Sequence, residues 1–337
     1  MLKEIKKILI IRFSSIGDIV LCSPVIRCTK KAYPDAEIHF ITKKDYASLV
    51  EKNPFISKTY LIDEKDVKPH IPSLQKENYD LIIDLHKNLR SLRLKSHLRG
   101  KKLTFNKLNF RKLLYCRLKI NTLPKKHLVD RYFDALRKYN INNDNQGLDF
   151  YLPETISVKL PTENYIAIVI GAKFATKQIP AELIAEIISK TTKDCILLGG
   201  NTDISLADEI MQLAKTKRLH NFCGKLDLFA SAYILKKAAV VLTNDTGLMH
   251  IAAAFSKKIV SVWGNTVADF GMYPYMPNKE ERKDYFIVEV KNLSCRPCSK
   301  IGYKKCPKKH FHCMKPVSYT HLRAHETVLD LVCRLLL

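Results

Sequence analysis

Residues 8–26 read ILIIRFSSIGDIVLCSPVI, and this stretch decides the fold class. The apolar run at residues 8–11 is typical of a strand that is buried on both faces of a parallel sheet. A polar turn containing Gly17 follows, after which apolar side chains recur at helical spacing over residues 20–26. A strand, a glycine turn and a helix in succession begin a βαβ unit, so the stretch predicts a doubly wound α/β fold.

The same alternation of short apolar runs and helical segments forms two series along the chain. The first series continues with runs at residues 38–41 and 81–85 and with helical segments at residues 47–50 and 72–76. The second series has runs at residues 166–170, 195–198, 240–243 and 259–263. Between the series, the chain is rich in Asn, Asp and Pro over residues 140–161, which is typical of a linker.

Length and composition agree with two globular domains. We expect two Rossmann-like domains of doubly wound parallel sheet facing a cleft, at residues 1–155 and 160–316, and 337 residues suffice for two apolar cores. The chain is 46% hydrophobic and 27% charged, and no apolar run approaches the roughly 20 residues of a membrane helix. Arg12 interrupts the first run and no small-residue cleavage site follows, so we interpret this run as a strand and not as a signal peptide.

The chain has a formal net charge of +24, and ten cysteines. Such a charge attracts polyanions, which leaves nucleic acid, an anionic membrane and a phosphorylated substrate as candidate partners. Half of the cysteines are scattered among apolar neighbours, at positions 22, 28, 116, 195 and 223. Dispersed reduced thiols of this kind are typical of a cytoplasmic protein.

The end of the chain, residues 317–337, begins VSYTHLRAHET and resembles a translated sequencing adapter. The alternative is a genuine amphipathic helix, because Leu329, Val332 and Leu336 have roughly helical spacing. We interpret this tail as non-native and leave it out of the functional argument.

Asp18 is the candidate catalytic residue of the first domain. It follows the first glycine turn, at the carboxyl edge of the sheet, where doubly wound folds bind ligands and a helix N-terminus favours an ionised carboxylate. Such a carboxylate can accept a proton from a sugar hydroxyl, or it can serve only as a helix cap. The turn lacks the G-x-G-x-x-G pattern, so it is not typical of a dinucleotide-binding site.

Three loops of the second domain carry candidate ligand-binding residues. Residues 241–254 read VLTNDTGLMHIAAA, a strand leading into a helix whose capped N-terminus can admit a diphosphate or can be an ordinary cap. The loop GAKFATK at residues 171–177 offers two lysines for phosphate. The loop LGGNTD at residues 198–203 offers a carboxylate for a ribose diol.

Four segments together, in this order and spacing, resemble the ADP-heptose:lipopolysaccharide heptosyltransferases, glycosyltransferase family 9. They are RFSSIGDIVLCSP at residues 12–24, GAKFATKQIP at 171–180, LGGNTD at 198–203 and NDTGLMHIAAA at 244–254. The resemblance implies a GT-B fold for residues 5–316 or so. It also implies an inverting transferase that moves heptose, or a related sugar, from ADP-heptose or another nucleotide sugar to a lipopolysaccharide inner-core acceptor. No catalytic metal and no cofactor are implied.

The resemblance further implies residue roles, with Asp18 as the base for the acceptor hydroxyl. The donor-binding residues that it implies are Lys173, Thr176, Lys177, Asp203, Asp245, Thr246, Gly247 and His250. Some members have Thr-Thr where this chain has Ala172-Lys173, so the donor sugar stays open. Two alternatives also stay open: a GT-B sugar-nucleotide epimerase, and a non-enzymatic basic protein that binds membrane or nucleic acid.

Between Leu85 and Val129 the chain has 14 Lys or Arg residues and no Asp or Glu. Interleaved apolar side chains suit an amphipathic surface on anionic lipid headgroups, and a solvated cationic face is the alternative. We expect an anionic phosphorylated glycolipid acceptor, bound by His86, Lys87 and Arg90, at the cytoplasmic surface of the inner membrane. No helix-turn-helix or RNP-like pattern is present, so we expect no nucleic-acid partner, and we expect a monomer.

Four further cysteines lie within 19 residues, at Cys295, Cys298, Cys306 and Cys313. A C-x-x-C pair is common in zinc sites, but the last two cysteines are too far apart for a second such pair. A structural zinc site is one interpretation, and reduced or redox-sensitive thiols are the other.

Overall fold

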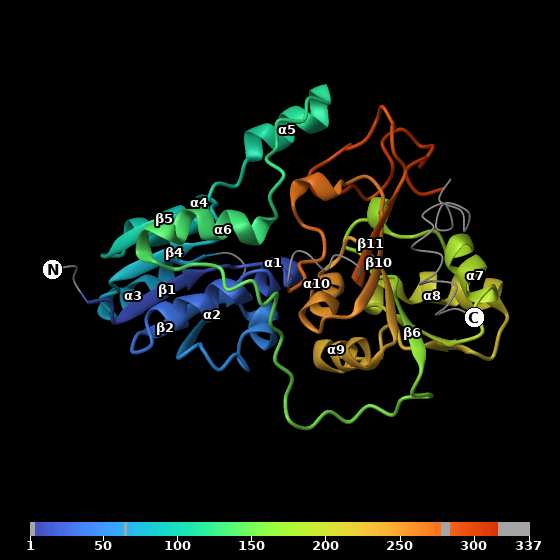
Figure 1. The fold of residues 1–337 in the computed structure, drawn as a ribbon, viewed down its shortest axis with the longest axis horizontal. Coiled ribbons are helices and arrows are strands. Elements are labelled where there is room, and N and C mark those ends of the chain that lie inside the picture. The colour runs from blue at the N-terminus through green and yellow to red at the C-terminus, as the bar shows by residue number, and fades with distance from the viewer. Residues whose placement is uncertain (1–3, 64–65, 278–283, 316–337) are drawn as a thin grey trace. The chain divides into compact units, whose positions relative to one another are not determined.

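A computed structural model describes residues 4–63, 66–277 and 284–315 of the chain, so the tail at residues 317–337 lies outside the described residues (Figure 1). The chain forms two compact units. The first contains the residues up to Lys107 together with Lys126–Pro153, and the second contains Leu108–Lys125 together with the residues from Glu154 onward.

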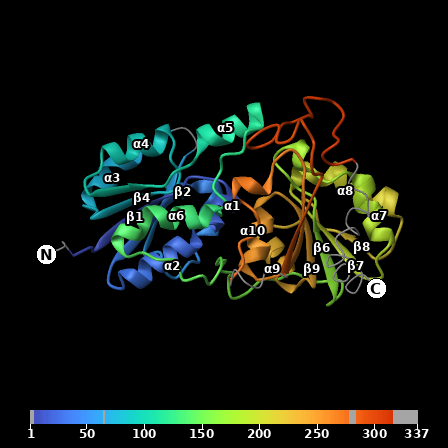
Figure 2. The same ribbon diagram turned by 45° about the horizontal axis from the view of Figure 1, so that its top comes forward.

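The first unit is built on a five-stranded parallel sheet in the order β3-β2-β1-β4-β5. Its strands are β1 (Lys7–Ile11), β2 (Glu37–Lys43), β3 (Lys58–Ile62), β4 (Leu81–Asp84) and β5 (Lys101–Thr104). Its α-helices are α1 (Ile16–Val20), α2 (Ser23–Ala32), α3 (Ile71–Lys76), α4 (Leu89–Ser96) and α6 (Leu128–Leu136). Figure 2 shows α3 and α4 on one face of this sheet and α2 and α6 on the other.

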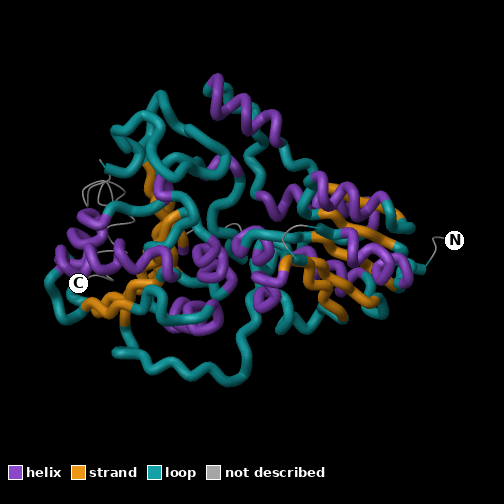
Figure 3. The backbone as a smooth tube through the Cα atoms, turned by 180° about the vertical axis from the view of Figure 1, so that it is seen from behind, coloured by secondary structure: helices purple, strands orange, loops and turns teal. Residues whose placement is uncertain are grey.

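The second unit is built on a six-stranded parallel sheet in the order β11-β10-β9-β6-β7-β8. Its strands are β6 (Tyr165–Val169), β7 (Asp194–Leu198), β8 (Leu219–Asn221), β9 (Val240–Asn244), β10 (Lys258–Trp263) and β11 (Tyr285–Glu289). Its α-helices are α5 (Asn109–Leu118), α7 (Ala181–Ser189), α8 (Ile204–Ala214), α9 (Leu228–Lys237) and α10 (Gly247–Ala254). Helices α7 and α8 lie on one face of this sheet and α9 and α10 on the other (Figure 1), and Figure 3 shows the alternation of helices and strands in both units.

Each sheet reverses its strand order beside its first strand. Strand β1 pairs with both β2 and β4, and β6 pairs with both β7 and β9. Doubly wound folds bind ligands at the carboxyl ends of the strands at such a reversal. The loops after β1 and β4, and those after β6 and β9, are therefore where each unit is expected to hold a ligand.

The predicted α/β fold with two parallel sheets is confirmed, and every predicted strand is present. Residues 47–50, predicted to be helical, fall at the end of a short 3₁₀ helix, Lys44–Leu49. None of the helices among the described residues is long and apolar enough to cross a bilayer.

Residues 108–125, which the sequence analysis placed in the first domain, pack with the second unit instead. The chain leaves the first unit after β5, forms α5 and returns before α6. The Tyr115 ring packs edge-on against Phe270, with the ring centroids 6.2 Å apart. The Lys119 ammonium donates to the carbonyl oxygens of Cys295 and Pro297, at 3.2 and 2.8 Å. These contacts hold α5 on the second unit.

Candidate active site

Asp18 lies in the first turn of α1, the short helix that follows the loop after β1. Its Oδ1 is 2.5 Å from Nη2 of Arg12, and its Oδ2 accepts a hydrogen bond from the Ser15 hydroxyl at 2.9 Å. Because Ser15 is the N-cap of the helix, the same carboxylate closes a capping box. Asp18 therefore does cap the helix, and its side chain also keeps partial exposure at the carboxyl edge of the sheet.

Arg12 is a residue of this loop to which the sequence analysis assigned no role. Its guanidinium is buried and donates to the carbonyl oxygens of Ser14 and Leu85, so it joins the loop after β1 to the end of β4. Burial disfavours the charged guanidinium, but the neighbouring acidic groups, Asp18 foremost among them, together outweigh burial and raise the pKa of Arg12. The sequence feature that could have indicated a role for Arg12 is its position, as a charged residue directly after the apolar run of residues 8–11.

Two of the three predicted acceptor residues meet beside the loop after β1. The His86 ring packs against the Phe13 ring, with centroids 4.9 Å apart, and the Arg90 guanidinium lies 5.8 Å from the centroid of the same ring. The Nδ1 atom of His86 is buried with no hydrogen-bond partner within the part of the chain that the structure describes. Lys87 is exposed. Acceptor binding by these residues stays a prediction.

His86 has a consequence for the pH dependence of folding. Burial, and then the positive charges of Arg12 and Lys107, lower the pKa of His86 to about 3. An unfolded histidine titrates near pH 6.5, so below that pH the unfolded chain takes up a proton that the folded chain does not. We expect the free energy of unfolding to fall as the pH drops from about 6.5 towards 3, by up to ~1.4 kcal/mol per pH unit from this residue.

Chemical denaturation at a series of pH values measures this effect. His86→Gln should flatten the pH dependence, whereas His97→Gln, on an exposed histidine, should leave it unchanged. Equal pH dependence in the wild type and in His86→Gln would contradict the prediction.

In the second unit, an ion pair joins the loops that follow β6 and β9. The Lys177 Nζ lies 2.5 Å from Oδ2 of Asp245, and these side chains are only 17% and 11% exposed. The Thr266 hydroxyl, after β10, donates to the same carboxylate oxygen at 2.8 Å. Asp245 directly precedes Thr246, the N-cap of α10. Because Lys177 pairs with Asp245, its cation lies close to the N-terminus of this helix. A cation beside a helix N-terminus is suited to binding a diphosphate.

The other predicted donor residues have different surroundings. Thr176 is buried, and its hydroxyl exchanges two hydrogen bonds with the backbone of Tyr303, at 3.1 and 2.8 Å. The buried Asp203 carboxylate accepts from the backbone N–H of Gly200 at 2.8 Å and from Gln178 at 3.3 Å. These two side chains hold loops together, so their ligand roles stay predictions. Lys173 is exposed, and His250 is buried in the first turn of α10.

Arg296, in the cysteine-rich segment, braces the loop after β10. Its buried guanidinium donates to the carbonyl oxygens of Gly264 at 2.6 Å and Thr266 at 2.7 Å, and it pairs with Glu289 at 2.6 Å. The loop also packs tightly against the loop after β6, because a Cβ on Gly264 would lie 2.5 Å from the Thr176 carbonyl oxygen. In the sequence, Arg296 stands between two cysteines that suggest a metal site, so its bracing role could not be predicted there.

The interpretation of the four cysteines as a structural zinc site stays a prediction. No group of three or more His, Cys, Asp or Glu side chains is placed to hold a metal among the residues described. The Cys298 thiol donates to the carbonyl oxygen of Cys295 at 2.9 Å. Burial raises the pKa of Cys298 to about 11 and that of Cys313 to about 12, so both are protonated, weakly nucleophilic thiols at neutral pH.

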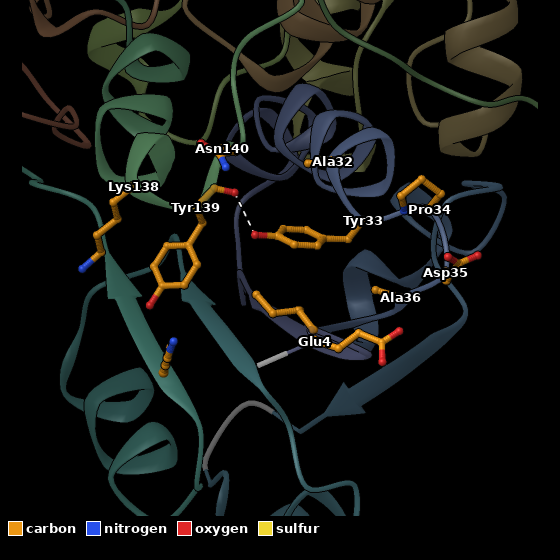
Figure 4. Close-up of a pocket in the computed structure, with 11 residues that line it drawn as sticks. Glu4, Ala32, Tyr33, Pro34, Asp35, Ala36, Lys138, Tyr139 and Asn140 are labelled. Atoms are coloured by element: carbon orange, nitrogen blue, oxygen red, sulfur yellow. Dashed lines mark hydrogen bonds between the residues drawn. The ribbon is translucent and has the colours of Figure 1, made fainter. Parts of the chain in front are cut away.

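A pocket of about 470 Å³ lies at the opposite edge of the first sheet, where β2 and β5 begin (Figure 4). The Tyr33 hydroxyl donates to the carbonyl oxygen of Tyr139 across it, at 2.8 Å, and Lys101 and Lys138 also line it. None of the predicted site residues lines this pocket. The loops after β1 and β4 and those after β6 and β9, where the strand order of each sheet reverses, therefore remain the candidate site.

Comparisons with known proteins agree with the geometry of these loops. Residues 68–306 match glycosyltransferase family 9 (heptosyltransferase). Lipopolysaccharide heptosyltransferase 1 of Campylobacter coli is 26% identical over 289 residues, which cover 77% of this chain and 84% of that protein. The fold is shared with E. coli ADP-heptose lps heptosyltransferase II, at TM-score 0.71 and 18% identity over 97% of this chain and 99% of that one. It is also shared with E. coli heptosyltransferase WaaC with ADP, at TM-score 0.67 and 19% identity over 94% and 98%.

These likenesses give the two units the GT-B fold. The family match spans well over half of the chain and includes the loops that carry Lys177 and Asp245. The chain is therefore a glycosyltransferase, and it belongs to glycosyltransferase family 9, the heptosyltransferases.

Proposed function

We propose that this protein transfers heptose from ADP-heptose to an inner-core acceptor of lipopolysaccharide, with inversion at the anomeric carbon. Family membership supports the transferase class, and the names of the relatives support the acceptor, since they include lipopolysaccharide heptosyltransferase 1 of Campylobacter coli. The single observation that carries the proposal is the ion pair of Lys177 with Asp245 beside the N-terminus of α10. That arrangement suits a nucleoside diphosphate better than any neutral ligand.

In the proposed reaction, Asp18 takes the proton of the acceptor hydroxyl as its oxygen attacks the anomeric carbon of the donor. The bond between that carbon and the diphosphate breaks, and the nucleoside diphosphate leaves with the electron pair. Attack from the side opposite the leaving group inverts the configuration. Arg12 orients the Asp18 carboxylate through the 2.5 Å ion pair.

The leaving diphosphate gains negative charge as the bond breaks. Lys177 and the free N–H groups of α10 are the groups that we assign to stabilise it, in a partly buried site where a charge interaction is stronger than in water. The acceptor is assigned to His86, Lys87 and Arg90 on the first unit. We also propose a cytoplasmic, monomeric protein that attaches peripherally to the inner membrane.

Mass spectrometry of purified protein with a panel of ADP-, GDP- and UDP-sugars, with and without lipopolysaccharide core acceptors, tests the proposal. We expect ADP-heptose to be consumed only when acceptor is present, with a mass gain of one heptose on the acceptor. Conversion of a nucleotide sugar to its epimer without acceptor would overturn the proposal in favour of an epimerase. Turnover of none of the donors would also overturn it.

Lys177→Met should raise the KM for the donor by about tenfold or more, because a charge-assisted contact to phosphate contributes roughly 1.5–3 kcal/mol. Removal of the cation also leaves the Asp245 carboxylate facing the donor phosphates. Lys173→Met is the matched control, since Lys173 is an exposed lysine of the same loop. Steady-state kinetics with ADP-heptose measure both, and an equal KM in the two variants would contradict the assignment.

A further inference from the structure

Helix α5 has two faces with different surroundings. Lys112, Tyr115 and Lys119 recur at spacings of three and four, so they lie on one side of the helix. Lys112 lies over the Phe270 ring at 5.4 Å, and the Tyr115 hydroxyl donates to Asp269 at 3.4 Å. This face is the one that packs on the second unit, and Figure 2 shows α5 beside the red loop of that unit.

The opposite face of α5 is apolar and exposed. Phe110, Leu114 and Leu118 follow one another at a spacing of four, and Leu113 stands beside them. The exposed fractions are 76% for Phe110, 63% for Leu118 and 39% for Leu113. These four residues, called here the outer face of α5, form a continuous apolar stripe on a helix that is already anchored by its other side. Stripes of this kind are typical of surfaces that bind a partner.

The charges near the outer face of α5 indicate which kind of partner this face binds. Residues 107–126 contain seven Lys or Arg and no Asp or Glu, and two of the seven, Lys112 and Lys119, lie on the anchored face of α5. Arg111 and Arg117 are exposed on α5 itself. Cations beside exposed large apolar side chains suit a membrane surface, where headgroup phosphates meet the cations and the acyl region meets the apolar stripe. Nucleic acid would use the cations but would leave Phe110 and Leu118 in water.

We propose that the outer face of α5 inserts into the headgroup region of an anionic lipid bilayer and is the membrane-docking element of this protein. The inference rests on the proposed peripheral attachment to the inner membrane and names the helix that makes this attachment. Anchoring of α5 on Asp269 and on the Cys295–Cys298 turn makes it a fixed attachment of the second unit. That turn also braces the loop after β10 through Arg296.

Vesicle co-sedimentation tests the proposal without any sugar, so its failure is distinct from the failure of the transferase proposal. We expect the full chain to bind vesicles of phosphatidylethanolamine with phosphatidylglycerol and not vesicles of phosphatidylcholine alone, with binding that weakens as salt increases. The double variant Phe110→Ser/Leu118→Ser should weaken binding by about tenfold or more. Leu213→Ser on α8, an apolar residue 48% exposed, is the matched control and should bind as the wild type does.

A second pair of variants tests the charge. Arg117→Gln should weaken binding to the anionic vesicles, whereas Lys217→Gln, on an exposed lysine next to α8, should not. The thermal unfolding temperature of all four variants should equal that of the wild type, because each altered side chain is exposed. Wild-type binding that Phe110→Ser/Leu118→Ser does not weaken would overturn the proposal, and so would equal binding to neutral vesicles. Tight DNA binding with no vesicle binding would assign the surface to nucleic acid instead.

Discussion

Asp18→Asn is expected to lower the rate of sugar transfer by about 100- to 10,000-fold, because an amide cannot take the proton of the acceptor hydroxyl. The substitution keeps the shape of the side chain and leaves an oxygen for the Ser15 hydroxyl. Donor affinity should stay within about twofold, since the proposed donor residues all lie on the second unit. Turnover at saturating donor and donor binding by calorimetry measure the two effects separately.

Two controls separate a base from a helix cap. Ser15→Ala removes the hydroxyl that bonds Asp18 but keeps the carboxylate, so it should cost about 1 kcal/mol of stability and leave most of the transfer rate. Asp35→Asn changes an exposed carboxylate at the opposite edge of the sheet and should change neither. If Asp18→Asn kept more than about a tenth of the wild-type rate, Asp18 would not be the base.

Arg296→Met is expected to have the largest effect on stability. It removes a buried guanidinium that bonds the carbonyl oxygens of Gly264 and Thr266 and pairs with Glu289, so three acceptors lose their donor together. Loss of one partner of such a buried network costs roughly 3 kcal/mol or more. The same change loosens the loop whose Thr266 hydroxyl holds Asp245, so the KM for the donor should rise by about tenfold with a smaller change in kcat.

Arg296→Lys and Lys291→Met complete this test. A single ammonium cannot span two carbonyl oxygens and a carboxylate with the geometry of a guanidinium, so Arg296→Lys should recover only part of the loss. Lys291 is exposed nearby, and its replacement by Met should leave unfolding and donor KM as in the wild type. An Arg296→Met protein with the wild-type melting temperature and donor KM would contradict the bracing role.

The strands that the sequence predicts are the seven central ones, and the four that it misses are the edge strands β3, β5, β8 and β11. A central strand is buried on both faces, so its sequence is a continuous apolar run, as in β1, where residues 8–11 are fully buried. In the edge strand β5, which reads KKLT, two lysines break the apolar run. The local pattern of β5 therefore carries no clear signal of a strand.

Some residues of the candidate site could be named from the sequence, and the roles of others could not. Asp18, Lys177 and Asp245 could be named from the sequence because each lies between a strand at the reversal of its sheet and the α-helix or 3₁₀ helix that follows, or in the first turn of that helix. Arg12 and Arg296 could not be given their roles, since each acts on carbonyl oxygens of residues far along the chain. For Thr176 and Asp203, only the packed loops reveal that the side chains bond neighbouring backbone.

By itself, the sequence determined the fold class, the family and the loops that carry the site, because central strands and glycine turns are local patterns. The tertiary structure alone decided that Asp18 pairs with Arg12, that Arg296 braces the loop after β10, and that α5 belongs to the second unit. The physical reason is that hydrogen bonds and ion pairs between residues distant in sequence depend on where the packed sheets place them. No local periodicity encodes those distances.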